Sequence, residues 1–187
     1  MEIYLIRHTP TATGKGLCYG QTDVALADSF AADIEAICKK LPELKPDARV
    51  FSSPLSRCLR LAERLSAEVI LDSRLLEINF GDWENQPFDA LDSGFFGHWT
   101  ENFVTVSPPN GESFTDLCNR AESFWQHLLN IDTSQVFVVT HAGVIRALLA
   151  RLLQLPPANA FQFRVDCGSV HKLQRVDDYT HIHFLNL

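Results

Sequence analysis

In residues 135–143 the chain carries the sequence Gln135-Val136-Phe137-Val138-Val139-Thr140-His141-Ala142-Gly143. The run from Val136 to Val139 has no polar interruption, which is typical of a strand covered on both faces of a sheet. A histidine and two small residues follow soon after it, and residues 142–152 are predicted to form the next helix. A buried strand that leads directly into a helix is the repeating unit of α/β folds.

The same alternation extends outward from this unit in both directions. We predict strands over residues 2–6, 49–52, 69–71 and 135–139, and closing strands over residues 161–164, 169–175 and 181–185. We predict helices over residues 29–41, 54–65, 113–129 and 142–152. This order favours an α/β fold, a three-layer sandwich whose central sheet is largely parallel and flanked by helices.

One long segment, residues 72–110, does not fit the alternation. It is irregular and rich in aromatic residues, namely Phe80, Trp83, Phe88, Phe95, Phe96, Trp99 and Phe103. We expect short helices and loops there. We interpret residues 1–187 as a single domain in which residues 72–110 form a lid or a substrate-specificity insertion.

The composition excludes several classes of protein. The chain has 187 residues and a formal charge of −7, whereas a nucleic-acid binder would usually carry a basic face. We find no run of roughly 18 apolar residues, so we predict no membrane span. The start of the chain lacks the basic residues and clean apolar stretch of a secretory signal, so we expect a cytoplasmic protein. No pattern in the chain predicts an oligomeric state.

The cysteine and histidine patterns do not favour a metal or a thiol mechanism. The five cysteines include no C-x-x-C pair, which argues against a disulfide framework and a zinc ribbon. Cys58 and Arg64 have the C-x5-R spacing of cysteine phosphatases, but that segment has no glycine and is predicted to be helical. His181 and His183 share one face of a predicted strand without an evident third ligand. We therefore predict neither a metal nor a cofactor.

Charged and ionisable residues follow the ends of three predicted strands. Arg7 and His8 follow the first strand, Arg57 comes just after the second, and His141 follows the strand of residues 135–139. Glu77 lies in a loop further along the chain. Ligands of open α/β sheets bind outside the carboxyl ends of the strands. A lone His is more often structural and a lone Arg more often solvated. Two histidines, two arginines and a carboxylate at one edge of the sheet instead predict a functional site.

This set of residue types suits the transfer of a phosphoryl group. Arginine forks match phosphate oxygens and keep their charge, and the helix start at Ala142 offers further N–H donors. A neutral imidazole is a competent nucleophile, and the nearby arginines are expected to push the pKa of His8 below its usual value of about 6.5. A carboxyl group such as Glu77 is suited to give a proton to the leaving oxygen and later to take one from water.

Four blocks of the sequence resemble the histidine phosphatase superfamily, which includes the cofactor-dependent phosphoglycerate mutases. The blocks are Leu5-Ile6-Arg7-His8-Thr9, Ser52-Ser53-Pro54-Leu55-Ser56-Arg57, Leu76-Glu77-Ile78-Asn79-Phe80-Gly81-Asp82-Trp83-Glu84 and Val139-Thr140-His141-Ala142-Gly143-Val144-Ile145-Arg146. The resemblance implies a phosphoglycerate mutase-like fold and a phosphatase that works through a phosphohistidine. It implies that His8 is the nucleophile, that Arg7, Arg57 and His141 bind phosphate, and that Glu77 is the proton donor.

One position departs from the family pattern, since the residue after the nucleophile is usually Gly and here is Thr9. The segment Cys18-Tyr19-Gly20-Gln21-Thr22-Asp23-Val24 resembles the α-ribazole phosphatase branch of the family. This branch implies dephosphorylation of α-ribazole 5′-phosphate during assembly of the cobalamin nucleotide loop. We expect Thr9, Gly20, Gln21 and Trp83 to contact the substrate, and Phe96 and Trp99 are further candidates for stacking on its base.

Other functions remain open from the sequence alone. A broad-specificity sugar-phosphate phosphatase uses the same reacting groups, and so does a phosphoglycerate mutase-like enzyme, although the short chain disfavours the mutase. A hypothesis of another class is a phosphate-binding protein without catalysis, which the complete set of reacting residues disfavours. In each case the predicted partner is a small-molecule phosphate ester.

Overall fold

A computed structural model describes residues 1–14 and 16–187. The strands are β1 (Glu2–Arg7), β2 (Arg49–Ser52), β3 (Val69–Leu71), β4 (Gln135–Thr140), β5 (Val170–Val176) and β6 (Tyr179–Phe184). Within the described residues they form one sheet with the order β3-β2-β4-β1-β5-β6. The first four strands of that order are parallel, while β5 runs antiparallel to β1 and β6 antiparallel to β5. The largely parallel sheet is therefore confirmed.

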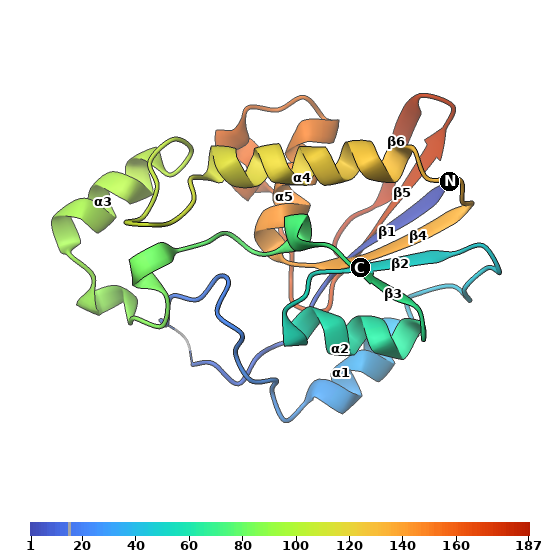
Figure 1. The fold of residues 1–187 in the computed structure, drawn as a ribbon, viewed down its shortest axis with the longest axis horizontal. Coiled ribbons are helices and arrows are strands. Elements are labelled where there is room, and N and C mark those ends of the chain that lie inside the picture. Colours follow the sequence, from blue (N-terminus) through green and yellow to red (C-terminus); the bar gives the residue numbers. More distant parts are fainter. Residues whose placement is uncertain (15) are drawn as a thin grey trace.

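Helices cover both faces of this sheet. The helices of the described chain are α1 (Phe30–Cys38), α2 (Ser56–Leu65), α3 (Ser93–Asn102), α4 (Phe114–Leu129) and α5 (Ala142–Leu152), and all but α3 pack on the sheet. Figure 1 shows α4 and α5 on one side of the sheet and α1 and α2 on the other, so the three-layer sandwich is also confirmed. Four short 3₁₀ turns complete the regular structure of the described chain, at Ser73–Leu75, Gly81–Trp83, Phe88–Ala90 and Pro157–Gln162.

The central strands supply side chains to two separate cores. In β1, Ile3 and Leu5 pack into the core under α4 and α5, whereas Tyr4 and Ile6 pack into the core over α1 and α2. Successive side chains of a strand point to opposite faces, and both faces are covered, so the strand needs apolar residues at every position. Each such side chain stabilises the fold by roughly 1.5–3 kcal/mol when it is fully buried. The uninterrupted apolar run in β4 has the same cause.

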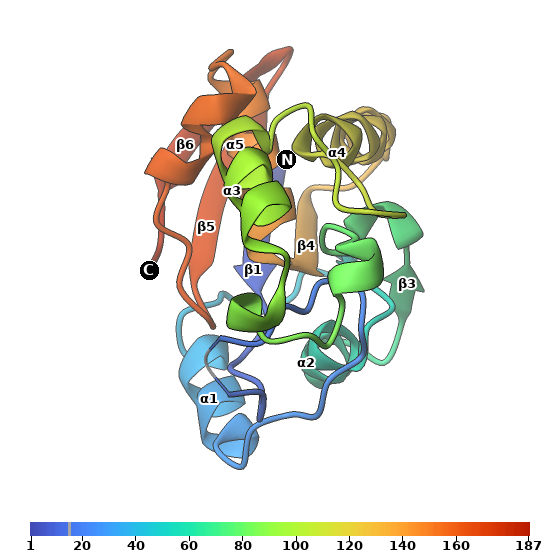
Figure 2. The same ribbon diagram turned by 90° about the vertical axis from the view of Figure 1, so that its left-hand side faces the viewer.

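The helix α3 lies apart from these layers. It sits beyond the carboxyl ends of the parallel strands, and Figure 2 shows it standing in front of β1 and β4 when the molecule is viewed from that end. Asp92 caps the helix by accepting a hydrogen bond from the backbone N–H of Phe95 at 2.8 Å. The short helices expected in residues 72–110 are therefore present, and they bring that segment over the edge of the sheet where the charged residues lie.

One predicted strand is wrong. Residues 161–164 form the end of a 3₁₀ turn and then extended chain outside the sheet, instead of a strand. The alternation of Phe161 and Phe163 with polar residues imitates a strand pattern, but other contacts use these residues. Phe161 packs against Phe103 with a ring-centroid distance of 5.0 Å, and the carbonyl of Phe163 accepts a hydrogen bond from Arg146. None of the helices in the described ranges is long and apolar enough to span a membrane.

Candidate active site

The carboxyl ends of β1, β2 and β4 bring together His8, Arg7, Arg57 and His141, which we call the Arg–His cluster. His8 follows β1 directly and His141 follows β4 directly. These two strands are parallel neighbours in the sheet, so the two histidines lie side by side at its edge. Their ring centroids lie 5.1 Å apart. Arg57 belongs to the first turn of α2 and is completely buried. Residues far apart in the sequence thus meet at the sheet edge where the sequence predicts a site.

The ring of His8 is held in one tautomer. Its Nδ1 lies 2.7 Å from the carbonyl oxygen of Thr9, and since a carbonyl only accepts, we assign the ring proton to Nδ1. Burial, together with the charges of Arg57 and Arg7, lowers the pKa of His8 to about 3. The imidazole is therefore neutral near pH 7, and its Nε2 carries a free lone pair.

Arg57 is fixed by three acceptors. Its Nε donates to Nδ1 of His141 at 3.3 Å, Nη1 donates to the carbonyl of Thr22 at 2.8 Å, and Nη2 donates to the carbonyl of Gly20 at 2.5 Å. A guanidinium has five N–H donors, so two of the five remain for a ligand. A fully buried cation held in this way is a pre-positioned partner for an anion.

The bond from Arg57 also sets the tautomer of His141. Because Nδ1 of His141 accepts from Arg57, the ring proton is on Nε2, which lies 2.8 Å from Oγ of Ser53. Burial, His8 and Arg57 hold the pKa of His141 well below its usual value. His141 is thus a neutral N–H donor beside a neutral acceptor in His8. One ring offers a lone pair and the other a proton.

Arg7 contributes a second guanidinium from the end of β1. Its Nη1 donates to the carbonyl of Val165 at 2.7 Å, whereas its buried Nε has no partner among the described residues. A buried donor left without a partner costs about 1–3 kcal/mol, and an oxygen of a bound anion would remove that cost. Oγ1 of Thr9 is likewise buried without a partner in the described chain. The threonine in place of the family's usual Gly still supplies the carbonyl that orients His8.

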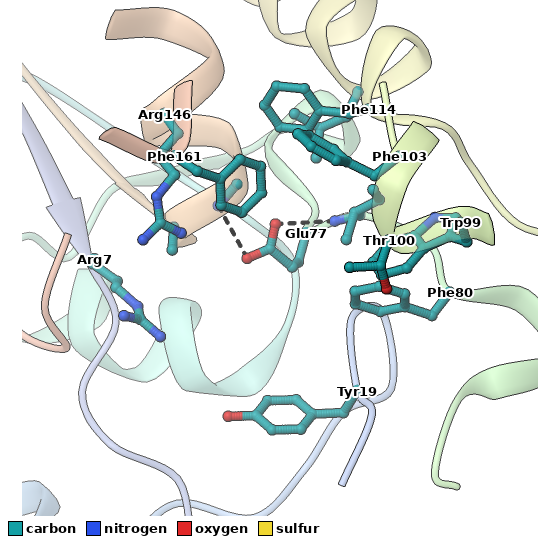
Figure 3. A pocket seen from close by; sticks show the side chains of 14 residues that line it. Arg7, Tyr19, Glu77, Phe80, Trp99, Thr100, Phe103, Phe114, Arg146 and Phe161 are labelled. Carbon is teal, nitrogen blue, oxygen red and sulfur yellow. Dashed lines mark hydrogen bonds between the residues drawn. The ribbon is translucent and has the colours of Figure 1, made fainter. Parts of the chain in front are cut away.

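Glu77 lies at the amino end of α5 (Figure 3). Its Oε1 accepts from the backbone N–H of Ile78 at 3.0 Å, and its Oε2 accepts from the N–H of Gly143 at 3.2 Å. A side chain at position 143 would overlap Oε1, so this approach requires glycine. Backbone N–H groups at a helix start favour negative charge. The same end of α5 places Ala142 at the site wall.

The carboxylate of Glu84 gathers one loop around itself, a role that the sequence argument did not assign. It accepts hydrogen bonds from the backbone N–H groups of Gly20, Gln21, Thr22 and Phe80, and from the hydroxyl of Thr22 at 2.6 Å. Burial alone would raise the pKa of Glu84, but these bonds outweigh it and lower the pKa. The signal was available, since Glu84 closes the third family block.

This loop is the support of Arg57, because the carbonyls of Gly20 and Thr22 hold its guanidinium. Gly20 is sterically required, since a Cβ there would overlap the carbonyl of Ile78. Gln21 donates from Nε2 to the carbonyl of Glu77 at 3.1 Å. Neither Gly20 nor Gln21 lines the cavity of the site. The structure therefore shows both residues in supporting contacts, and their predicted contact with the substrate stays a prediction.

An apolar cavity of about 480 Å³ opens beside Arg7 and Glu77, and we call it the aromatic pocket (Figure 3). Its rings come from parts of the chain that are far apart in the sequence. Its aromatic lining consists of Tyr19, Phe80, Trp99, Phe103, Phe114 and Phe161. Trp99, one of the candidates for stacking, is in this wall. Trp83 is not, because it is buried beneath the wall against Cys18 and Leu91.

The groups that suggested other chemistry lie elsewhere. Cys58 is buried in α2 with its Sγ 3.4 Å from Nε2 of His141, and burial raises the pKa of this thiol. A protonated, buried thiol is a poor nucleophile. His181 and His183 are exposed on β6. Across residues 1–14 and 16–187 no group of three or more His, Cys, Asp or Glu side chains is arranged to hold a metal ion.

Comparisons with known proteins agree with this geometry. The family model for the histidine phosphatase superfamily (branch 1) matches residues 3–187. The adenosylcobalamin/α-ribazole phosphatase of Salmonella typhimurium is 29% identical over 200 residues, which cover 100% of this chain and 96% of that protein. The glucosyl-3-phosphoglycerate phosphatase of Mycobacterium tuberculosis is 30% identical over 175 residues, covering 84% of this chain and 78% of the other.

Solved structures are similar along the whole length. The crystal structure of the α-ribazole phosphatase from Shigella flexneri superposes with a TM-score of 0.89 at 27% identity, and the match covers 100% of this chain and 96% of that one. The mycobacterial glucosyl-3-phosphoglycerate phosphatase superposes with a TM-score of 0.84 at 25% identity, covering 99% and 98% of the two chains.

Proposed function

The chain belongs to the histidine phosphatase superfamily, and from that premise we propose that it hydrolyses α-ribazole 5′-phosphate through a phosphohistidine at His8. The chain is a phosphatase by its family and its relatives. The identity of the ester and the role of each residue are our proposal. The observation that carries it is the aromatic pocket, which opens directly beside the Arg–His cluster.

In the first step, Nε2 of His8 attacks the phosphorus atom. The new N–P bond forms as the bond from phosphorus to the ester oxygen breaks, and the protonated carboxyl of Glu77 gives its proton to the departing oxygen. Arg7 and the two remaining N–H groups of Arg57 hold the equatorial oxygens. The Nε2–H of His141, which exchanges Oγ of Ser53 for a phosphate oxygen when the substrate binds, and the N–H of Ala142 add neutral donors. Together they stabilise the charge that spreads over the transferring group.

In the second step, water attacks the phosphohistidine. Glu77, now a carboxylate, takes a proton from the water as its oxygen bonds to phosphorus and the N–P bond breaks. Inorganic phosphate leaves, and His8 returns to the neutral tautomer that the carbonyl of Thr9 orients. The cycle is balanced with one water consumed and requires no metal ion or redox cofactor.

The aromatic pocket supports an ester whose alcohol carries an apolar ring system. Six aromatic residues line it, and its polar lining is limited to a few groups, among them Thr100 and Arg146. Pockets of this composition bind flat aromatic groups through burial and edge-to-face contacts. The benzimidazole-like base of α-ribazole 5′-phosphate has this character. A plain sugar phosphate would leave most of the wall without a partner.

A panel of phosphate esters tests the proposal. It should contain α-ribazole 5′-phosphate, glucose 6-phosphate, 3-phosphoglycerate, phosphoserine and 4-nitrophenyl phosphate, assayed for phosphate release with a chelator present. We expect kcat/KM for α-ribazole 5′-phosphate to exceed the other biological esters by about tenfold or more, since burying one ring system is worth over 1.4 kcal/mol. Equal rates across the panel would favour the broad-specificity phosphatase, and no turnover would favour a binding protein.

A further inference from the structure

Arg146 is a charged residue in the wall of the aromatic pocket that the proposed mechanism does not use. It lies in α5 and lines the pocket together with Arg7 and Glu77. Figure 3 shows its guanidinium directed into the pocket on the same side as Arg7, with Glu77 facing it. Arg146 ends the fourth family block, and the resemblance implies no role for it.

Two contacts hold the guanidinium of Arg146 in place. Its Nε donates to the carbonyl of Phe163 at 3.1 Å, and its central carbon lies 5.0 Å from the centroid of the Phe161 ring. Among the residues that the structure describes, no hydrogen bond or ion pair involves the two Nη groups. The guanidinium is therefore held in place, and the N–H donors of its two Nη groups remain available to a ligand.

The partial burial of Arg146 makes it unfavourable to leave the N–H donors of its Nη groups without a hydrogen-bonding partner. Arg146 is half-buried, and burial together with the charge of Arg7 lowers the pKa of Arg146. A charged group in an apolar wall needs a hydrogen-bonding partner to offset its lost hydration. Arginine is expected at such a position when it recognises oxygen atoms in a defined plane.

The position of Arg146 differs from that of the two arginines of the Arg–His cluster. Arg57 is held by the loop that Glu84 gathers, and Arg7 is held by the carbonyl of Val165. Arg146 instead packs on Phe161, a ring of the aromatic wall. Its donors therefore face the part of a ligand that lies between the reacting phosphate and the apolar ring system.

We propose that Arg146 donates hydrogen bonds to the sugar hydroxyls of a nucleoside 5′-phosphate-type substrate and so determines specificity for the leaving alcohol. The inference rests on the proposed function, because it requires phosphorus at His8 and the base in the aromatic pocket. The ribose then occupies the space between them. A neutral diol suits this space better than a carboxylate, because the reacting phosphate beside it carries close to two negative charges near pH 7 and would repel a second anion.

The test compares substrates with and without a sugar. Arg146→Met keeps an apolar stem of similar reach and removes the donors. We expect its kcat/KM for α-ribazole 5′-phosphate to fall about tenfold or more, as for a site that loses a hydrogen bond to a substrate hydroxyl. We expect kcat/KM for 4-nitrophenyl phosphate, and the inhibition constant of inorganic phosphate, to change by less than about threefold.

Substrate analogues supply the second arm. The wild-type enzyme should lose a similar factor when the 2′ and 3′ hydroxyls are removed from α-ribazole 5′-phosphate, whereas Arg146→Met should barely distinguish the two esters. Arg151→Met is the matched control, because Arg151 lies on the same helix, is exposed and pairs with Glu122 at 3.0 Å. It should leave every constant unchanged. Arg146→Leu, which also lacks donors, gives the same comparison if the methionine variant does not fold.

Two results would overturn the inference. Equal losses on both substrates with weaker inhibition by phosphate would make Arg146 a ligand of the reacting phosphate. A wild-type enzyme indifferent to the sugar hydroxyls would remove the proposed contact. Failure of the proposed function looks different, because the wild-type enzyme would then prefer another ester of the panel. Adenosine 5′-phosphate and its 2′,3′-dideoxy analogue would in that case still test Arg146.

Discussion

The Arg–His cluster and the aromatic pocket share Arg7, yet they are built in different ways. In the cluster, hydrogen bonds to the backbone or to buried side chains fix each guanidinium and imidazole, and the side chains of His8, Arg57 and His141 are almost completely buried. In the pocket, rings rest on other rings, and Phe161 is 54% exposed. Hydrogen-bonded geometry is suited to hold reacting atoms, whereas ring packing tolerates changes of shape. Chemistry and selectivity should therefore be separable by mutation.

The largest expected effect comes from removing the nucleophile. His8→Ala should reduce turnover of every ester at least about a thousandfold, because the step that forms the N–P bond is lost. The aromatic pocket should remain intact, so the variant should still bind an unphosphorylated benzimidazole nucleoside as the wild type does. Phosphate release and titration calorimetry measure the two properties. Substantial residual turnover would reject the role of His8.

The next effect tests whether the cluster depends on its outer support. Glu84→Gln replaces one acceptor oxygen with an amide that faces N–H donors, so the loop of Gly20 and Thr22 loses its hold on Arg57. We expect a fall in kcat of about 10- to 100-fold on all esters, in the range seen when supports of reacting groups are removed, together with weaker inhibition by inorganic phosphate. Wild-type phosphate affinity in this variant would show that Arg57 does not need Glu84.

A matched variant controls for the change of charge. Glu101→Gln makes the same substitution at an exposed position of α3. It should leave both kcat and the affinity for phosphate unaltered. A loss of similar size in both variants would mean that the overall charge of this end of the molecule, and not the position of Arg57, sets the rate.

A smaller effect should be confined to the pocket. Phe161→Ala removes an exposed ring, and we expect KM for α-ribazole 5′-phosphate to rise about five- to tenfold, the equivalent of roughly 1 kcal/mol of ring contact. Hydrolysis of 4-nitrophenyl phosphate should change less. Phe95→Ala is the control, because Phe95 is an exposed ring of α3 outside the pocket lining. Equal losses on both esters would break the separation between cluster and pocket.

The difference between the two regions also explains what the sequence could predict. His8 and His141 each follow an apolar run, and the rule that parallel strands end at one edge is enough to bring them together. The rings carry no comparable signal, since an aromatic residue serves a core or a ligand equally well. Trp83 and Trp99 illustrate this, because only the structure shows that the first is buried beneath the wall and the second lines it.

Supports of the site were harder to predict than the reacting groups. Glu84 is one carboxylate among many, and its role appears only when the backbone N–H groups of a distant loop are seen to converge on it. Phe161 was expected in a strand because aromatic and polar residues alternate there. The same alternation occurs where a loop turns one of its rings into a pocket, as Phe161 does. Local periodicity predicted the layers, but not the contacts made between loops.

The smallest effect separates titration of the cluster from titration of the rest of the fold. His171 on β5 is fully buried, with Nε2 3.1 Å from Oγ of Ser169, and burial lowers the pKa of His171 to about 4. The folded protein therefore keeps this ring neutral, while the unfolded chain takes up a proton below about pH 6.5. The stability that depends on the neutral ring is complete above that pH and is lost as the pH falls toward 4.

Between pH 7.5 and 5.5 this loss amounts to about 1.4 kcal/mol for each such histidine. His8 and His141 are shifted in the same direction, so the wild-type free energy of unfolding should fall by about 4 kcal/mol if all three contribute equally. His171→Gln should reduce the fall by about a third and leave kcat at pH 7.5 unchanged, because His171 lies outside the cluster. Urea unfolding at the two pH values measures this. An unaltered pH dependence in the variant would mean that His171 does not titrate between the two states.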